Sequence, residues 1–138
     1  NHESSLRPDH FVTQKIITSA KQIAKGSKEI LELGRLDVSR DWGWAPEYVE
    51  AMWLMLQQDK IEDFVIATGE TNTLEKFVET SFAYFNLNWK DHVKQNKALM
   101  RPSDLLENVG DTAKAREKLN WRAKFRMADV VRLMISEK

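Results

Sequence analysis

Cysteine is absent from the 138-residue chain, which excludes disulfides, thiolate nucleophiles and thiolate metal sites. Net charge is absent too, because 21 Lys and Arg side chains balance 21 Asp and Glu side chains. A neutral domain has no broad electrostatic field with which to hold nucleic acid or an anionic membrane. No apolar run approaches the ~20 residues of a membrane-spanning helix. We therefore expect no nucleic-acid or membrane partner, and a cytoplasmic location fits the lack of cysteine.

Glycine and proline are scarce, with five and three residues, about half of the usual ~12% share. Few chain-breaking residues favour helices, while 42% hydrophobic residues suffice for a globular core. The length is that of one domain, so residues 1–138 are expected to form a single unit. The apolar spacing predicts an α/β fold of mixed helices and short strands, with five helices and two to four strands.

The predicted helices are delimited by their caps and apolar stripes. A first helix begins at Pro8 and ends at Gly26, which suits the left-handed position after a helix. Asn120 is predicted to end a later helix in the same way. The other helices are expected to start after Pro46, after an Asn72 cap with Glu75 three residues on, after Asp111 or Thr112, and near Met127.

The remaining predictions concern strands and core residues. Residues 30–33 and 64–68 read as short strands, the second buried on both faces. The helix after Pro46 has an apolar stripe that is expected to be buried, and residues 86–110 are the least regular part. That stripe consists of Tyr48, Val49, Met52, Trp53 and Leu56. Trp121, Phe77, Phe82 and Phe85 are also assigned to the core.

The residues alone reveal no catalytic centre. The three histidines, His2, His10 and His92, have no partner at metal-ligand spacing on one helix, and a zinc site needs three or four converging ligands. The sequence contains no Gly-x-Ser-x-Gly motif, no P-loop and no Gly-rich dinucleotide turn. We expect neither a metal site nor a nucleophile with its base.

Anion binding has better support. Arg7 precedes a predicted helix start, with Lys15 two turns further on, while Arg40 and Arg101 lie in separate loops. Arginine suits bidentate phosphate recognition, so three arginines from three loops can converge on one diphosphate. The alternative is that they are solvated surface charges. Trp42 and Trp44 have two interpretations as well, stacking on a base or packing in the core.

Several motifs together resemble one family. They are Asn1-His2-Glu3-Ser4, Arg40-Asp41-Trp42-Gly43, Met55-Leu56-Gln57-Gln58, and Asp111-x-x-Lys114-Ala115 followed by Leu119-x-Trp121. The last is typical of extended short-chain dehydrogenase/reductases that act on nucleotide sugars. The first three narrow the resemblance to the GDP-mannose 4,6-dehydratases, and it extends over nearly the whole chain.

The resemblance implies the substrate-binding C-terminal portion of such an enzyme, without the Rossmann half. The Gly-rich NADP loop, the catalytic Thr and Glu and the Tyr-x-x-x-Lys pair of the family lie upstream. The full-length enzyme would be an NADP-dependent lyase that converts GDP-mannose to GDP-4-dehydro-6-deoxy-mannose in GDP-fucose biosynthesis. It would form a homo-oligomer, a dimer or a tetramer. This portion alone, lacking catalytic residues, is expected to be inactive.

The resemblance also assigns binding residues. His2 and Arg7 match positions that contact NADP, and the substrate contacts are Asn1, Val12, Lys15, Arg40 and Arg101. Two alternatives stay open: a GDP-sugar epimerase or reductase of the same superfamily, and a non-catalytic nucleotide-sugar-binding module. If a sheet is missing, the helix at 48–56 and the strand at 64–68 lose partners. An exposed apolar patch and self-association are then expected.

Overall fold

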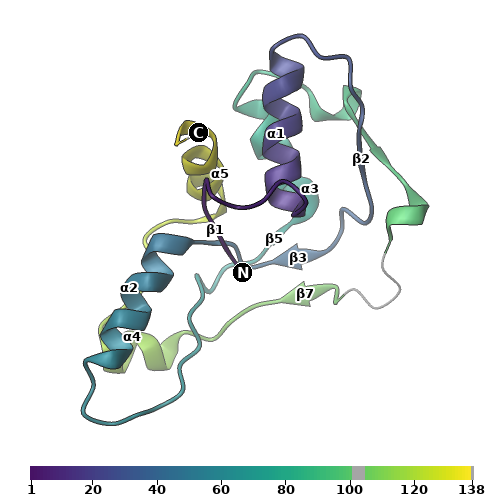
Figure 1. Cartoon of the computed structure of the whole chain (residues 1–138). Coiled ribbons are helices and arrows are strands. Elements are labelled where there is room, and N and C mark those ends of the chain that lie inside the picture. The colour runs from purple at the N-terminus through teal and green to yellow at the C-terminus, as the bar shows by residue number, and fades with distance from the viewer. Residues whose placement is uncertain (101–104, 138) are drawn as a thin grey trace.

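The computed structural model describes residues 1–100 and 105–137, which form five α-helices and seven very short strands (Figure 1). Arg101 and the motif that contains it therefore lie outside the described residues. Three helices, α1 (Val12–Ala24), α3 (Leu74–Ala83) and α5 (Met127–Ser136), pack against one another. Figure 1 shows the other two, α2 (Ala45–Leu56) and α4 (Ala113–Leu119), together at the opposite end. The mixed α/β class is confirmed.

The larger core fills the space between α1, α3 and α5. Phe77, Phe82, Ile16 and Val130 are fully buried there, and Phe85 packs against them. Trp42 and Trp44 belong to the same core, and the Trp42 ring lies 5.0 Å from that of Phe77. The core interpretation of these tryptophans is therefore confirmed.

The strands make three small sheets. One pairs β1 (His2–Glu3) with β4 (Gly43–Trp44), and another pairs β2 (Leu31–Leu33) with β6 (Val93–Gln95), both in parallel. In the third, β3 (Ser39–Arg40) lies between β5 (Asn72–Thr73), antiparallel, and β7 (Glu107–Asn108), parallel. Two short 3₁₀ helices, Trp89–Asp91 and Lys97–Leu99, flank β6. Two-residue strands carry no alternation signal, so the prediction of two to four strands was too low.

Helix boundaries follow the predicted caps in part. Gly26 and Asn120 both have positive φ, 100° and 50°, and follow α1 and α4 as predicted. However, α1 begins at Val12 rather than at Pro8, because residues 5–10 form turns in which the Arg7 N–H bonds to the Ser4 carbonyl. The cap of α3 is Thr73, whose hydroxyl accepts the Lys76 N–H, rather than Asn72.

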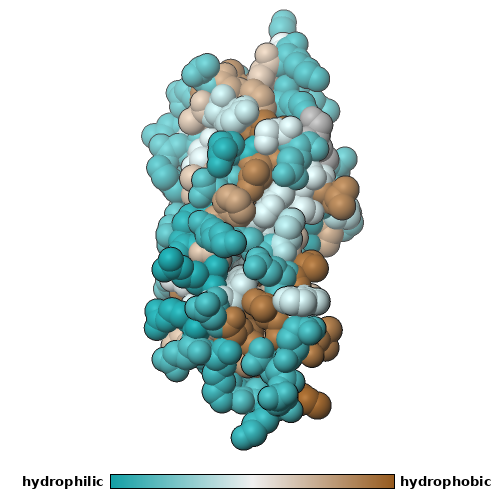
Figure 2. Space-filling view, turned by 90° about the vertical axis from the view of Figure 1, so that its left-hand side faces the viewer, coloured by the Kyte–Doolittle hydropathy of each residue, from teal (hydrophilic) through white to brown (hydrophobic). Residues whose placement is uncertain are grey.

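The apolar stripe of α2 was predicted to be buried, and this was wrong for all but Tyr48. Val49, Met52, Trp53 and Leu56 are between 52% and 81% exposed. Instead, α2 turns Ala51 toward a second, smaller core around Trp121, which is buried as predicted. Figure 2 shows the resulting hydrophobic surface in the lower part of the molecule, the level at which Figure 1 places α2.

The second predicted strand is also wrong in this structure. Residues 64–68 are extended but pair with no strand among the described residues. Phe64 and Ile66 are half-buried against the smaller core, whereas Val65 between them is 52% exposed. Ala67, on the same side as Val65, is 8% exposed, and both lie beside Gly110, so each side of the segment is partly covered.

Two buried carboxylates connect the parts of the fold. Asp41 is 4% exposed and accepts the N–H groups of Thr68 and Gly69 at 2.9 and 2.8 Å. Glu47, 5% exposed, accepts the N–H of Lys124 at 2.7 Å. Each satisfies backbone donors that have no partner in regular structure, which explains why these charges are tolerated inside. No described helix is long and apolar enough to cross a membrane.

Candidate functional site

A cavity of about 500 Å³ lies between the first turn of α1, the end of β2 and β3. The family resemblance assigned seven binding residues, and five of them belong to the described lining of this cavity. These are Asn1, Arg7, Val12, Lys15 and Arg40. Four of them belong to the first fifteen residues, and the fold brings Arg40 of β3 beside them.

A buried carboxylate anchors the cavity at β1. Glu3 is 3% exposed, its Oε2 accepts the Thr13 hydroxyl at 2.9 Å, and Arg7 Nε lies 3.1 Å away as an ion pair. The Arg7 N–H at that nitrogen is not aligned for a hydrogen bond with a described residue. Burial raises the pKa of Glu3 despite the bond from Thr13 and the charge of Arg7. The Glu3 carboxylate is thus positioned by the Thr13 hydroxyl, and the Arg7 guanidinium by its ion pair with Glu3.

The other cations are held by backbone carbonyls. Lys15 Nζ donates to the Glu32 carbonyl at 2.8 Å, which ties α1 to β2. Arg40 Nη1 donates to the carbonyls of Ser39 and Leu105, each at 2.8 Å. These bonds are made to neutral carbonyls, and they fix the direction in which the cationic side chains point. The Arg7 guanidinium carbon also lies 3.8 Å from the centre of the Phe11 ring.

The charge balance of the cavity is positive. Its described lining includes three cationic side chains, those of Arg7, Lys15 and Arg40, against two carboxylates, those of Glu3 and Glu32. A fourth cation of the lining, Arg35, is paired with Asp37 by two hydrogen bonds. Such a cavity attracts anions, and fixed guanidinium groups are suited to phosphate oxygens.

His2 lies outside the described lining of this cavity. Its ring is 5.0 Å from that of Tyr48, and β1 pairs it with Gly43 of β4. Burial, followed by the positive charges of the chain's amino group and Arg7, lowers the pKa of His2, which favours the neutral imidazole. The Tyr48 hydroxyl is buried without a hydrogen-bond partner in the described part of the chain, and burial raises its pKa.

The structure thus separates the two residues predicted to contact the cofactor. Arg7 joins the residues predicted to contact the substrate, whereas His2 packs beside them on β1. Glu3 and Thr13 were missed by the analysis of residue types, although both line the cavity and are buried. A carboxylate between polar residues near a helix start gives no signal of burial in a sequence. Within residues 1–100 and 105–137, no three His, Asp or Glu side chains converge as a metal site.

Two solved structures share this fold over nearly the whole chain. The dTDP-glucose 4,6-dehydratase from Bacillus anthracis in complex with NAD aligns over 98% of this chain and 41% of its own, with a TM-score of 0.84 and 14% identity. RMD from Pseudomonas aeruginosa complexed with NADPH aligns over 99% and 44%, with a TM-score of 0.81 and 20% identity. At sequence identities of 14% and 20%, the structural similarity defines the fold class of this chain.

Sequence comparison defines the family within that class. The family model described as GDP-mannose 4,6 dehydratase matches residues 1–134, so the chain belongs to that family. GDP-mannose 4,6 dehydratase 1 of Arabidopsis thaliana is 47% identical over 137 residues, which are 99% of this chain and 38% of the relative. The human enzyme is 43% identical over 152 residues, covering 98% and 41%. The chain spans about two fifths of the length of these relatives.

Proposed function

We propose that this chain is the C-terminal, substrate-binding portion of a GDP-mannose 4,6-dehydratase and that it forms a single domain. The observation that carries the proposal is the cavity in which Arg7, Lys15 and Arg40 meet. Three fixed cations around one cavity match the charge of a nucleotide diphosphate. Asn1 and Val12 would contact the rest of the GDP-sugar, and Arg101 would add a further guanidinium.

The bond geometry supports separate roles for the cations. Arg40 is oriented by two backbone carbonyls, and Lys15 by one, so neither has to be ordered when an anion arrives. Preorganised donors avoid much of the side-chain entropy cost of binding. Arg7 is positioned by its ion pair with Glu3, and its guanidinium has further N–H donors that can bind a second anion. Arg7 would therefore lie where substrate and cofactor meet.

The cofactor of the longer protein would be NADP, which supplies hydride removal at C4 of the mannose and its return at C6. In this chain His2 and Arg7 would contact it, with the neutral His2 imidazole able to donate and accept hydrogen bonds. No catalytic residue is assigned within residues 1–138. The lyase activity, the deoxysugar product and the homo-oligomer are proposed for the longer protein, and a cytoplasmic location stays a prediction from the sequence.

The exposed side of α2 supports the assignment to part of a larger enzyme. Met52, Trp53 and Leu56 are more than half exposed, and Val65 lies on a segment that pairs with no strand among the described residues. An apolar helix face beside an unpaired extended segment is suited to pack on a sheet. We infer that the NADP-binding portion covers this side.

Calorimetric titration of GDP-mannose into the 138-residue chain tests the proposed site. Saturable binding is expected, and Arg40→Ala and Arg101→Ala should each weaken it by about tenfold or more, the value of one charge-assisted hydrogen bond. Lys94→Ala, on an exposed strand position outside the cavity, is the matched control and should bind as the parent does. Absence of binding, or equal binding by Arg40→Ala and the parent, would overturn the assignment of the site to this cavity.

A further inference from the structure

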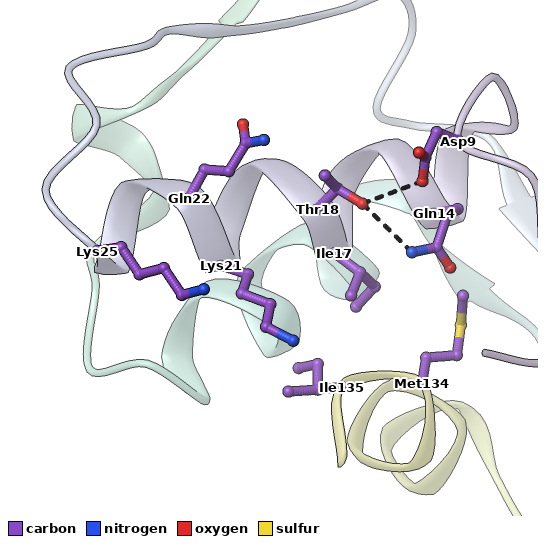
Figure 3. A pocket seen from close by; sticks show the side chains of 9 residues that line it. All are labelled: Asp9, Gln14, Ile17, Thr18, Lys21, Gln22, Lys25, Met134 and Ile135. Carbon is purple, nitrogen blue, oxygen red and sulfur yellow. Dashed lines mark hydrogen bonds between the residues drawn. The ribbon is translucent and has the colours of Figure 1, made fainter. Parts of the chain in front are cut away.

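A second cavity, of about 270 Å³, lies on a different face of α1, between this helix and α5 (Figure 3). It shares no described lining residue with the cavity of Arg7 and Arg40. Its volume lies just below the ~300–1,000 Å³ of sites for drug-sized ligands, so it is too small for a nucleotide sugar. Neither the family assignment nor the proposed function gives it a role.

A polar network at one end of this cavity leaves one acceptor unsatisfied. The Thr18 hydroxyl donates to Asp9 Oδ1, and Gln14 Nε2 donates to Thr18 Oγ1, each at 3.3 Å (Figure 3). Because a hydroxyl has a single proton, donation to Asp9 obliges Thr18 to accept from Gln14. This fixes the amide orientation and turns Gln14 Oε1 away from Thr18, toward the side of α5.

Gln14 is completely buried, and its Oε1 has no hydrogen-bond partner in the described part of the chain. A buried acceptor without a partner is unfavourable, and native proteins satisfy nearly all of them. The neighbours on the floor of the cavity are the apolar side chains of Ile17, Met134 and Ile135, which have no donor to offer. A donor group on a molecule that enters the cavity would satisfy this acceptor.

The remaining lining specifies the chemistry of that molecule. Asp9, in the turn before α1, and Gln14, in the first turn of α1, provide a carboxylate and a carbonyl at one end of the cavity. Lys21 and Lys25 lie on the last two turns of the helix and provide positive charge at the other end. An ammonium group is favoured at the first end, a carboxylate at the second, and an apolar group over the floor between them.

We propose that this cavity binds a small zwitterion with an apolar side chain, of the class of the aliphatic α-amino acids. The ammonium group donates to Gln14 Oε1, the carboxylate turns toward Lys25, and the aliphatic side chain covers Ile17 and Met134. Binding there satisfies the acceptor that the protein itself leaves unpaired.

Titration of the ¹⁵N-labelled 138-residue chain with L-leucine tests the proposal. Two probes of similar size are compared with it: 3-methylbutylamine, which lacks the carboxylate, and 4-methylpentanoate, which lacks the ammonium group. L-leucine should shift the side-chain amide signals of Gln14 and the signals of Ile135 in a saturable manner. Each single-charge probe should bind about tenfold more weakly, since each loses one charged contact.

Variants assign the two ends separately. Gln14→Met keeps the size of the side chain and removes the acceptor, so it should abolish the saturable shifts while the spectrum stays folded. Lys25→Gln should weaken L-leucine several-fold and leave 3-methylbutylamine unchanged, whereas Lys94→Gln should alter neither. Absence of saturation, equal affinity for all three probes, or full L-leucine binding by folded Gln14→Met would overturn the proposal.

Discussion

Replacing Gly43 with alanine tests the packing that holds β1 beside the candidate site. A Cβ at position 43 would lie 2.5 Å from the Tyr48 hydroxyl and 2.7 Å from its Cζ, closer than Cβ contacts in real structures. Tyr48 is 5% exposed and also contacts the rings of His2 and Trp121, so it has no open space to enter. Overpacking of this kind costs about 1–3 kcal/mol. We expect the upper end, about 3 kcal/mol, because the ring is rigid and enclosed.

The assay is thermal unfolding followed by near-ultraviolet circular dichroism. For a chain of this length about 3 kcal/mol corresponds to a fall in Tm of about 10 °C. In a Tyr48→Leu background the clashing ring atoms are gone, so Gly43→Ala should cost less than about 1 kcal/mol, which a double-mutant cycle measures as coupling. Gly26→Asn, where nothing lies within 4 Å, is a control with a smaller effect. Equal costs of Gly43→Ala in both backgrounds would refute the steric argument.

Three further predictions concern a helix cap, an exposed tryptophan and an ion pair. Thr73→Ala removes the hydrogen bond from the Lys76 N–H to the capping hydroxyl and should lower the free energy of unfolding by about 1 kcal/mol. Thr73→Ser keeps a capping hydroxyl and should lose much less stability. Chemical denaturation measures both variants. Because Trp53 is 59% exposed, Trp53→Ser should leave Tm nearly unchanged. It should reduce the binding of a hydrophobic dye and the self-association measured by sedimentation. A parent chain that is monomeric and binds no dye would contradict this prediction. Hydrogen bonds from Lys118 and Lys114 of α4 lower the pKa of Glu62 to about 2. The stability that these bonds contribute is therefore fully present above the ordinary glutamate pKa of 4.5 and is lost as the pH falls toward 2. Glu62→Gln should flatten that acid limb, and an NMR titration of Glu62 with an ordinary midpoint would contradict the ion pair.

The parts of the fold that the sequence predicts well are those decided by neighbours in the chain. The apolar spacing of α3 and α5 fixes which sides are buried, and Phe77, Phe82 and Val130 are found in the core. Gly26 and Asn120 end their helices because both tolerate positive φ. The start of α1 was misplaced because Pro8 suits a turn as well as a first helical position, and the bond from the Phe11 N–H to the Pro8 carbonyl closes such a turn.

The candidate site depends on contacts that spacing cannot reveal. Arg7, Lys15 and Arg40 were singled out by their type and by the family resemblance, but their convergence needs the pairing of β1 with β4 and of β3 with β7. Glu3 and Thr13 gave no signal because their burial results from these same pairings. Residue type therefore identifies the cations of the site, and only the fold shows which polar groups hold them.

The two clearest errors, the buried stripe of α2 and the strand at 64–68, have one cause. Helical spacing at Val49, Met52 and Leu56 and the β-prone run around Val65 are patterns of buried elements, yet these side chains are half or more exposed. Local patterns describe the environment for which a sequence is suited, whether or not its partner is present. The relatives are more than twice as long as this chain. A sheet from the portion outside this chain would pair with residues 64–68 and cover α2, and both patterns would then be satisfied by one partner.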